Sequence, residues 1–281
     1  MGWCPAFRLH SVAAVLHLTS RLLATNFGSP GGITTQDHQI TRLWHISWYF
    51  AAPLSILVWG LVVWCVIRYR AKPGRVPGQR QYHIPLEITY TIIPFVIVAI
   101  LFGYVYQAEN KIDKVSKDPA VQITVNGFQW GWQFIYTAVD INGQVSTPNF
   151  KEIGSVANEP SINDNNDLPV LRVPANEDVQ FNLVSLDVDH SFYIPEALFK
   201  RDLIPGIKNV VDMNFKAPGG PYIGECTQFC GTYHPFMRFQ VEVMSTQSFN
   251  AWVQQQTPNK SYYAGQSSPG VNGEAFGRSA S

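Results

Sequence analysis

The fold is decided first by residues 46–67, which read ISWYFAAPLSILVWGLVVWCVI and carry no charged side chain. A helix of this length spans about 33 Å, enough to cross a membrane hydrocarbon core of about 30 Å. A second apolar run covers residues 84–106, and Glu87 is its only charged residue. These runs predict two transmembrane helices, at 46–68 and 84–107. The alternative is a pair of helices buried in the core of a large soluble domain.

The loop between these helices, residues 69–83, sets their orientation. This loop and the residue before it contain five basic side chains and no acidic one: Arg68, Arg70, Lys72, Arg75 and Arg80. Loops rich in Lys and Arg stay on the cytoplasmic side of a membrane. We therefore expect a bacterial cell-membrane protein with two spans, whose N-terminus and whose residues after 107 are external. Residues 1–30 would be a signal peptide or leader, and residues 31–45 an external segment.

Residues 108–255 are predicted to form an external β domain. Short runs with alternating apolar side chains occur at 121–125, 132–136, 179–183 and 239–243. Alternation with a period of two is typical of strands, and several such strands without intervening helices favour a β-sandwich or barrel. Residues 142–169 are expected to form a long surface excursion, and 246–255 a closing helix. The Gly- and Ser-rich tail at 256–281 is expected to be disordered.

The composition excludes one class of function. The chain has 281 residues, with 20 Lys and Arg balanced by 20 Asp and Glu, and only 14% of its residues are charged. Proteins that bind nucleic acid usually need an excess of basic residues, so this neutral chain is not expected to bind one. The low charge instead fits a chain with membrane spans, where charged side chains are expensive.

A cluster of metal-binding residue types lies in residues 224–237, which read GECTQFCGTYHPFM, with one more histidine on a strand-like run upstream. The candidate ligands are two thiols, two imidazoles and a thioether: His190, Cys226, Cys230, His234 and Met237. This combination of ligands favours copper, and two thiols four residues apart could bridge two copper ions. One alternative is a disulfide between the two cysteines of an exported domain. Another is structural zinc, for which Met is a poor ligand.

The order of these parts resembles subunit II of the haem-copper cytochrome c oxidases, and the resemblance covers residues 44–250. Its most specific elements are the motifs Cys-x3-Cys-x3-His-x2-Met at 226–237 and Asp-Val-x-His-Ser-Phe at 187–192. The resemblance implies a two-helix hairpin that anchors an external cupredoxin-like Greek-key β-sandwich with a binuclear copper centre, CuA. It implies as copper ligands His190, Cys226, Cys230, His234, Met237 and the backbone carbonyl of Gln228.

Gln228 departs from this family, which usually has Glu at that position. The copper ligand there is a backbone carbonyl, so the change leaves the copper site intact. In the family the Glu carboxylate also reaches a magnesium or manganese ion at the border with subunit I. A neutral amide lacks the negative charge that a hard cation prefers, so we expect magnesium to be weakly bound or absent.

The resemblance also implies one residue for electron input and one for proton uptake. Trp130, within the sequence GFQWGW at 127–132, matches the tryptophan that receives electrons from cytochrome c in the family. Its neighbour Trp132 is equally well explained as a core aromatic residue. Glu87 matches the glutamate at the mouth of the family's proton channel. The alternative for Glu87 is a solvated carboxylate favoured by the positive end of the helix dipole.

The segment that follows Trp130 is strongly acidic. Between residues 133 and 190 there are nine acidic residues and only two basic ones. Such a charge would attract a cationic partner, and less so at high salt. Asp187 and Asp189, beside His190, are the best candidates for docking a cytochrome c. A solvated acidic loop without a partner explains residues 142–169 equally well.

The resemblance as a whole implies the electron-accepting subunit of a proton-pumping cytochrome c oxidase, which is not catalytic alone. The electron would pass from a cytochrome through copper to the haem of subunit I, where oxygen is reduced to water. The expected partners are oxidase subunits I and III, membrane lipid, and either a soluble cytochrome c or a membrane-bound cytochrome c domain. Two rivals are a copper-free quinol oxidase subunit II and a membrane-tethered copper carrier.

Overall fold

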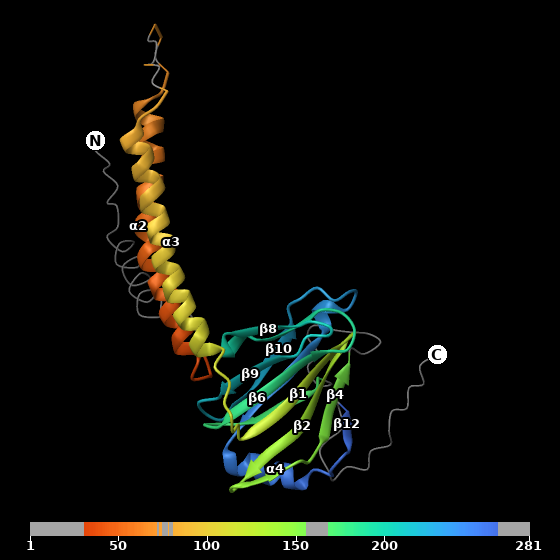
Figure 1. The fold of residues 1–281 in the computed structure, drawn as a ribbon. Helices are drawn as coiled ribbons and strands as arrows, with labels where there is room; N and C mark the ends of the chain where they lie inside the picture. The colour runs from red at the N-terminus through yellow and green to blue at the C-terminus, as the bar shows by residue number, and fades with distance from the viewer. Residues whose placement is uncertain (1–30, 72, 75–77, 79–80, 156–167, 264–281) are drawn as a thin grey trace, which may run out of the picture. The chain divides into compact units, whose positions relative to one another are not determined.

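The computed structural model describes residues 31–71, 73–74, 78, 81–155 and 168–263. These residues form two units: a helical unit, residues 38–111, and a β unit that combines residues 32–37 with residues 112–263. Figure 1 shows the helices and strands of both units. The predicted leader at 1–30 and residues 264–281 of the predicted disordered tail lie outside the described residues. The prediction of disorder from residue 256 is wrong for Ser261–Tyr263, which form a strand paired with Lys151–Ile153.

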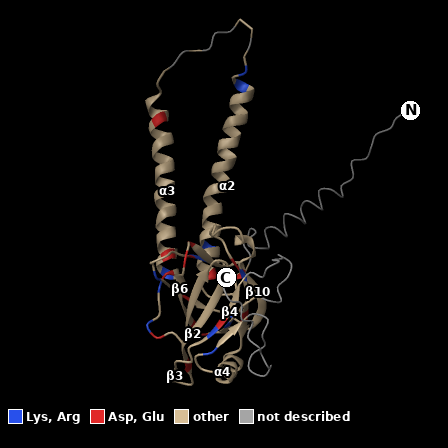
Figure 2. Cartoon of the chain, turned by 90° about the vertical axis from the view of Figure 1, so that its right-hand side faces the viewer, with Lys and Arg blue, Asp and Glu red and all other residues tan. Residues whose placement is uncertain are grey.

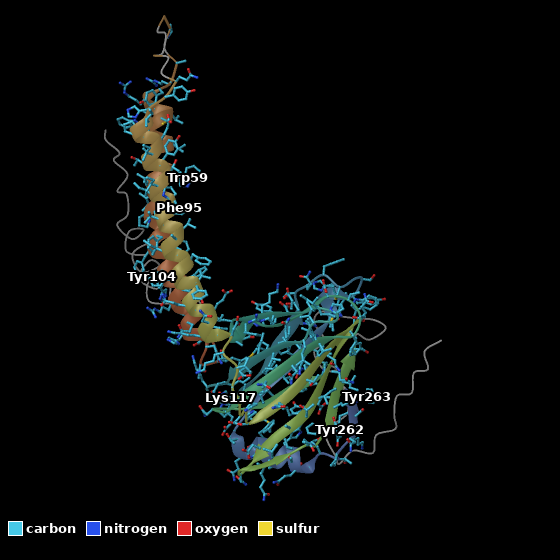
Figure 3. The ribbon with its side chains drawn as sticks, in the orientation of Figure 1. Trp59, Phe95, Tyr104, Lys117, Tyr262 and Tyr263 are labelled. Atoms are coloured by element: carbon cyan, nitrogen blue, oxygen red, sulfur yellow. The ribbon has the colours of Figure 1, made fainter. Side chains whose placement is uncertain are left out.

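The helical unit consists of α2 (Asp37–Arg68) and α3 (Ile84–Ile112), the two long apolar helices of the hairpin. None of the residues in the most apolar window of either helix is buried. Trp59 and Phe95, which are labelled on the hairpin in Figure 3, are 68% and 74% exposed. A soluble core would bury such side chains, whereas a bilayer covers them. The two predicted spans are confirmed, and the alternative of buried core helices is excluded.

The helices extend beyond the apolar runs from which they were predicted. The first begins at Asp37, inside the segment 31–45 that we expected to precede it, and the second continues to Ile112. Apolar runs mark only the part of a helix that lies in hydrocarbon, and backbone hydrogen bonding continues into the polar flanks. Asp37, in the first turn of α2, also suits the positive end of the helix dipole.

The β unit is a sandwich of two sheets. The larger sheet has the strand order β12-β4-β2-β1-β6-β9, with β3 paired to β2, and the smaller has the order β5-β11-β10-β7-β8. The strands of the larger sheet are β1 (Val121–Phe128), β2 (Gly131–Ile141), β3 (Gln144–Ser146), β4 (Phe150–Ser155), β6 (Asp178–Ser185), β9 (Asn209–Asn214) and β12 (Ser261–Tyr263). Those of the smaller are β5 (Val170–Pro174), β7 (His190–Ile194), β8 (Phe199–Leu203), β10 (Gly219–Cys226) and β11 (Arg238–Met244).

The four strands expected from alternating side chains are present as parts of β1, β2, β6 and β11, and the closing helix is α4 (Thr246–Gln255). The predicted excursion at 142–169 is wrong for Gln144–Ser146 and Phe150–Ser155, which form β3 and β4. The buried face of β4 presents Phe150, Glu152 and Gly154. A carboxylate and a glycine on that face leave no apolar alternation to recognise in the sequence.

Aromatic side chains join the two sheets beneath one end of the sandwich. Phe239 of β11 lies 5.3 Å from Trp132 and 5.4 Å from Phe134 of β2, between ring centroids, and stacks on Phe192 of β7 at 5.0 Å. All four side chains are fully buried. Aromatic pairs at these separations add to the stability that comes from burial alone. They provide a rigid base for the loop that precedes β11.

The residues just before α2 belong to the β unit. Thr34 forms an isolated bridge with Phe215, and the Lys216 ammonium lies 2.6 Å from the buried Asp37 carboxylate. The predicted external domain began at residue 108, so this short strand-like segment was missed. It contains one β-bridge and too few residues to show a periodic pattern.

Candidate metal centre

Two neighbouring strands of the smaller sheet carry the first two candidate metal-binding side chains. His190 is the first residue of β7, and Cys226 is the last residue of β10, where it pairs with Phe192 of β7. The chain then makes a loop, residues 227–237, before β11 begins. The backbone N–H of Cys226 donates to the carbonyl of Met237 at 3.0 Å and closes this loop at its base. The loop therefore brings Cys230, His234 and Met237 back close to Cys226.

The predicted copper ligands lie close together in space. Sγ of Cys226 and Sγ of Cys230 are 3.8 Å apart. Nδ1 of His190 lies 3.9 Å from the first sulfur, and Nδ1 of His234 lies 3.5 Å from the second. Two weaker donors complete the cluster: Met237 Sδ is 3.9 Å from Cys230 Sγ, and the Gln228 carbonyl oxygen is 3.2 Å from Cys226 Sγ.

The chemistry of this donor set fits a soft metal ion. Both cysteines are free, and their sulfur–sulfur distance of 3.8 Å is far beyond the bond of about 2.05 Å in a disulfide. The two thiols and Met237 are almost completely buried. A buried thioether beside two thiols and imidazoles suits copper, whereas structural zinc would use only cysteine and histidine.

The two thiols differ in acidity because they lie so close together. Burial disfavours the Cys226 thiolate, but hydrogen bonds from His190 and from the Ser191 backbone outweigh it and lower the pKa of Cys226. Burial and the negative charge of Cys226 raise the pKa of Cys230 to about 12. A bound metal cation would favour ionisation of both thiols.

Asp187 fixes the orientation of His190. Its Oδ1 accepts a hydrogen bond from His190 Nε2 at 2.7 Å. Because a carboxylate only accepts, Nε2 carries a proton, which leaves Nδ1, 3.9 Å from Cys226 Sγ, as the nitrogen that would bind a metal. The other carboxylate oxygen accepts from the backbone N–H of Gln129 at 2.6 Å. Burial would raise the pKa of Asp187, but these hydrogen bonds lower it below its ordinary value.

Trp130 contacts the metal-binding loop through a hydrogen bond. Its indole Nε1–H donates to the carbonyl of Cys230 at 3.1 Å, and the Gln129 amide donates to the same oxygen at 2.8 Å. The Trp130 ring meets Tyr233 edge to face at 4.9 Å. Gly231 makes this approach feasible, because it has a φ of 116° and a Cβ there would lie 3.1 Å from the Trp130 ring.

Trp132 serves both the core and the loop. It is completely buried, and its Nε1–H donates to the carbonyl of Met237 at 3.3 Å. The sequence left open whether this residue is a core aromatic or part of an electron path. The structure shows a core residue that also holds the far end of the metal-binding loop.

Several apolar side chains are exposed in the segments that carry this cluster. Phe229 is 80% exposed and Leu186 is 59% exposed, and Val188 and Tyr233 are partly exposed beside them in sequence. Sequence reasoning did not single out these residues, nor Gln129. An exposed aromatic residue between two metal-binding cysteines, as in Cys-Thr-Gln-Phe-Cys, is the signal that could have identified Phe229.

Apart from Asp187 and Asp189, the acidic residues of 133–190 that the structure describes are dispersed over the β unit. Glu152 is buried and paired with Arg172, and Asp140 and Asp178 accept hydrogen bonds from Gly143 and Asn214. Figure 2 shows acidic segments at several separate places in the β unit. Asp189 is exposed next to His190, and Asp187 is bound within the chain. Three of the nine acids lie outside the described residues: Glu159, Asp164 and Asp167.

Glu87 belongs to the helical unit, in the first turn of α3. Its Oε1 accepts a hydrogen bond from the backbone N–H of His83 at 2.8 Å, and the His83 ring accepts one from Leu86 N–H. Figure 2 shows the middle of both helices free of charged residues. The contact with His83 is the one expected of a carboxylate at a helix N-terminus.

Known proteins match both units. The family described as cytochrome c oxidase subunit II, periplasmic domain, matches residues 121–244, and the transmembrane domain of the same subunit matches residues 24–107. A probable cytochrome c oxidase subunit 2 of Nocardia farcinica is 32% identical over 83% of this chain and 75% of its own length. Cytochrome c oxidase subunit 2 of Mycobacterium tuberculosis is 31% identical over 84% of this chain and 77% of its own. Among solved structures, the periplasmic domain of subunit II of cytochrome oxidase from Bradyrhizobium japonicum is 26% identical. The match covers 50% of this chain and 95% of the Bradyrhizobium japonicum domain, with a TM-score of 0.40.

Proposed function

Because the chain belongs to the cytochrome c oxidase subunit II family, we propose that the cluster described above is a binuclear copper centre that accepts electrons from a cytochrome c. The chain is an electron-transfer subunit of a haem-copper oxidase in the bacterial membrane, with two spans and an external β unit. The observation that carries the proposal is the pair of buried free thiols, 3.8 Å apart, each with an imidazole nitrogen beside it.

The arrangement of donors supports two metal ions. A bound pair of copper ions supplies a one-electron redox centre shared between two metals. The chain provides two matched pairs of strong donors, His190 with Cys226 and His234 with Cys230. It adds one weak donor beside each thiol, the Gln228 carbonyl and the Met237 thioether. A site with one metal ion would leave one imidazole–thiol pair without a metal to bind.

Burial of the centre argues against a copper carrier. Cys226, Cys230 and Met237 are 5%, 3% and 1% exposed, so metal could not leave without opening the loop. A carrier needs a labile site that a partner can reach. A copper-free quinol oxidase subunit would have no need for five buried or half-buried donors in contact. Electron transfer is therefore the better use of this site.

Trp130 is our proposed point of electron input. It is half-buried, and its hydrogen bond to the Cys230 carbonyl connects it directly to a copper ligand. Replacing Trp130 with Phe removes this bond and should slow electron input from cytochrome c while the copper content stays normal. Trp48→Phe, which removes an indole from the hairpin, is the matched control. Stopped-flow reduction of the purified oxidase distinguishes them, and equal rates in both variants would remove Trp130 from the path.

The docking surface of the electron donor is proposed to be the apolar area around Trp130, with Asp189 at its edge. Phe229 and Leu186 are its most exposed apolar side chains, at 80% and 59%. Apolar centres with a polar rim are typical of interfaces between proteins. We propose a soluble cytochrome c or a membrane-bound cytochrome c domain as the partner, and oxidase subunits I and III as neighbours in the complex.

Glu87 is proposed to lie at the start of a proton path that continues in subunit I. Its position at the cytoplasmic end of α3 supports this role, and its hydrogen bond to His83 N–H supports a purely structural one. Glu87→Gln keeps a hydrogen-bond acceptor but cannot carry a proton. Slower turnover and proton pumping in this variant would support the path, and unchanged pumping would leave only the structural role.

Magnesium is proposed to be weak or absent at the border with subunit I. Gln228 offers a neutral amide where the family usually has a carboxylate, and hard cations prefer the charged ligand. Metal analysis of the purified oxidase should therefore find less than one magnesium per complex. Stoichiometric magnesium bound through the Gln228 side chain would contradict this proposal.

A further inference from the structure

A small recess lies between α2 and α3 at the end of the hairpin away from the basic loop. It is lined by one ridge of each helix: Gln39, Arg42, Leu43 and Ile46, and Tyr104, Gln107, Ala108 and Lys111. Figure 3 labels Tyr104 on the hairpin. Leu43, Ile46 and Ala108 make its apolar part, and the amides, the phenol and two cations make its polar part. The recess thus combines polar and charged hydrogen-bond donors with apolar side chains.

The two cations of this recess have no ion-pair partner within the described part of the chain. No carboxylate lines the recess beside Arg42 and Lys111. The acid at the start of α2, Asp37, is paired with Lys216, and Asp113, just after α3, is paired with Arg201. Two positive charges on facing helices repel each other unless an anion lies between them. The recess therefore has unsatisfied positive charge and several hydrogen-bond donors.

The sequence around the recess places it at the external surface of the bilayer. The basic loop is cytoplasmic, so this end of the hairpin is external. Trp44 and Trp48, which follow Arg42, form an edge-to-face pair at 6.0 Å between ring centroids and are both 42% exposed. Tryptophans with this exposure are typical of the interface where lipid headgroups lie. Arg42 is thus at the depth of the phosphates.

We propose that Arg42 and Lys111 bind the phosphate of an anionic phospholipid from the external leaflet, with its acyl chains against the exposed apolar side chains of α2 and α3. The recess itself is shallow, about 20 Å³, so a phosphate oxygen occupies it and the rest of the headgroup rests on its rim. Gln107 and Tyr104 are the neutral hydrogen-bond donors of the site, whereas the Gln39 amide contacts the His38 ring. A free phosphate would lack the apolar contacts that Leu43 and Ile46 provide below the cations.

Native mass spectrometry of the purified oxidase, exchanged into equal amounts of phosphatidylglycerol and phosphatidylcholine, tests this site. The intact protein should retain phosphatidylglycerol preferentially. Each basic residue near an anionic lipid surface contributes roughly a fivefold change in binding. The double variant Arg42→Gln, Lys111→Gln should therefore lose phosphatidylglycerol roughly 25-fold, with retention of phosphatidylcholine unchanged.

The matched control is the double variant Lys114→Gln, Lys117→Gln, which removes the same charge from exposed positions after α3. It should retain lipid as the unaltered protein does. Equal loss in both variants would show a general effect of charge and overturn the site, as would no loss in either. Inorganic phosphate that displaces the lipid at micromolar concentration would replace the lipid assignment with a free anion. Unchanged copper content in all variants confirms that they are folded.

Discussion

The metal-binding loop and the acid-bearing strands of the β unit arrange their polar side chains in opposite ways. Between Cys226 and Met237, four donor side chains and one carbonyl point into a single space a few ångströms across. From β2 to β6, the described acidic side chains are spread along the sandwich, and each contacts different residues. Asp178, at the start of β6, stands roughly 23 Å along the strand from Ser185 at its end.

Chain geometry explains this difference. A short loop closed at its base by the Cys226–Met237 hydrogen bond keeps all its side chains near one point. Strands carry successive side chains to opposite faces and separate their two ends by the length of the sandwich. Ligand spacing within one loop therefore predicts a site, whereas a count of charges over several strands does not predict a charged face. Three variants, each compared with a matched control variant, test this contrast.

The largest effect is expected for the buried acid Glu152. Burial raises its pKa to about 7, against the opposing influence of Arg172, from an ordinary value of 4.5. Between pH 4.5 and 7 the unfolded chain loses this proton while the folded chain keeps it, so stability falls as the pH rises through this window and is constant above it. The total loss is about 3 kcal/mol, at about 1.4 kcal/mol per pKa unit.

Glu152→Gln should remove this loss, so that the free energy of unfolding of the copper-free chain falls less between pH 5 and 7 than in the unaltered chain. Glu242→Gln is the control, because Glu242 pairs with the same arginine at 3.0 Å but its side chain is 44% exposed. Denaturant unfolding at several pH values measures both. Equal pH dependence in the two variants would mean that the strands do not bury an acid in the way described.

The next effect distinguishes the two adjacent acids of the β6–β7 turn. Both are exposed, but Asp187 accepts hydrogen bonds from His190 and from the Gln129 backbone. Asp187→Asn should lower copper affinity by about 10-fold to 100-fold, the usual cost of removing the partner of a metal-binding histidine. Asp189→Asn, which removes the same charge, should leave copper affinity unchanged and alter only the salt dependence of reduction by cytochrome c. Copper titration and reduction at two salt concentrations separate these roles.

If both variants bind copper normally and weaken docking equally, Asp187 belongs with the docking acids. That result would contradict the positioning role and restore an acidic docking surface beside the copper centre. It would also mean that His190 is oriented by contacts other than the 2.7 Å hydrogen bond.

The smallest effect concerns the apolar surface beside the loop. Phe229→Ser removes the most exposed aromatic side chain near the centre and should raise the KM for the cytochrome c donor about fivefold, as expected for a moderate interface contact. Val145→Ser, on β3, changes an apolar residue that is 71% exposed and should have no effect. Steady-state oxidation of the donor measures both. If Phe229→Ser has no effect but high salt abolishes binding, docking is electrostatic and the apolar assignment is wrong.

The sequence was sufficient for the parts of this protein that depend on local pattern. The two spans, four strands, the closing helix and the residues of the metal-binding loop all follow from periodicity or short spacing. It was insufficient where the outcome depends on distant contacts. Glu152 is buried because β5 brings Arg172 to it, and Asp187 is a partner of His190 because the β6–β7 turn folds back on the ring. The residues next to Glu152 and Asp187 in the sequence do not indicate the strand register and packing that make these contacts.

The central claim is that the loop binds two copper ions that share one electron. Copper analysis and electron paramagnetic resonance of the purified oxidase, with Cys65→Ser as the control for a thiol outside the site, test it most directly. We predict two copper ions per chain at this centre and an unpaired electron distributed over two copper nuclei, both retained in Cys65→Ser and lost in Cys230→Ser. One copper ion per chain with a localised electron, or a centre that survives Cys230→Ser, would contradict it.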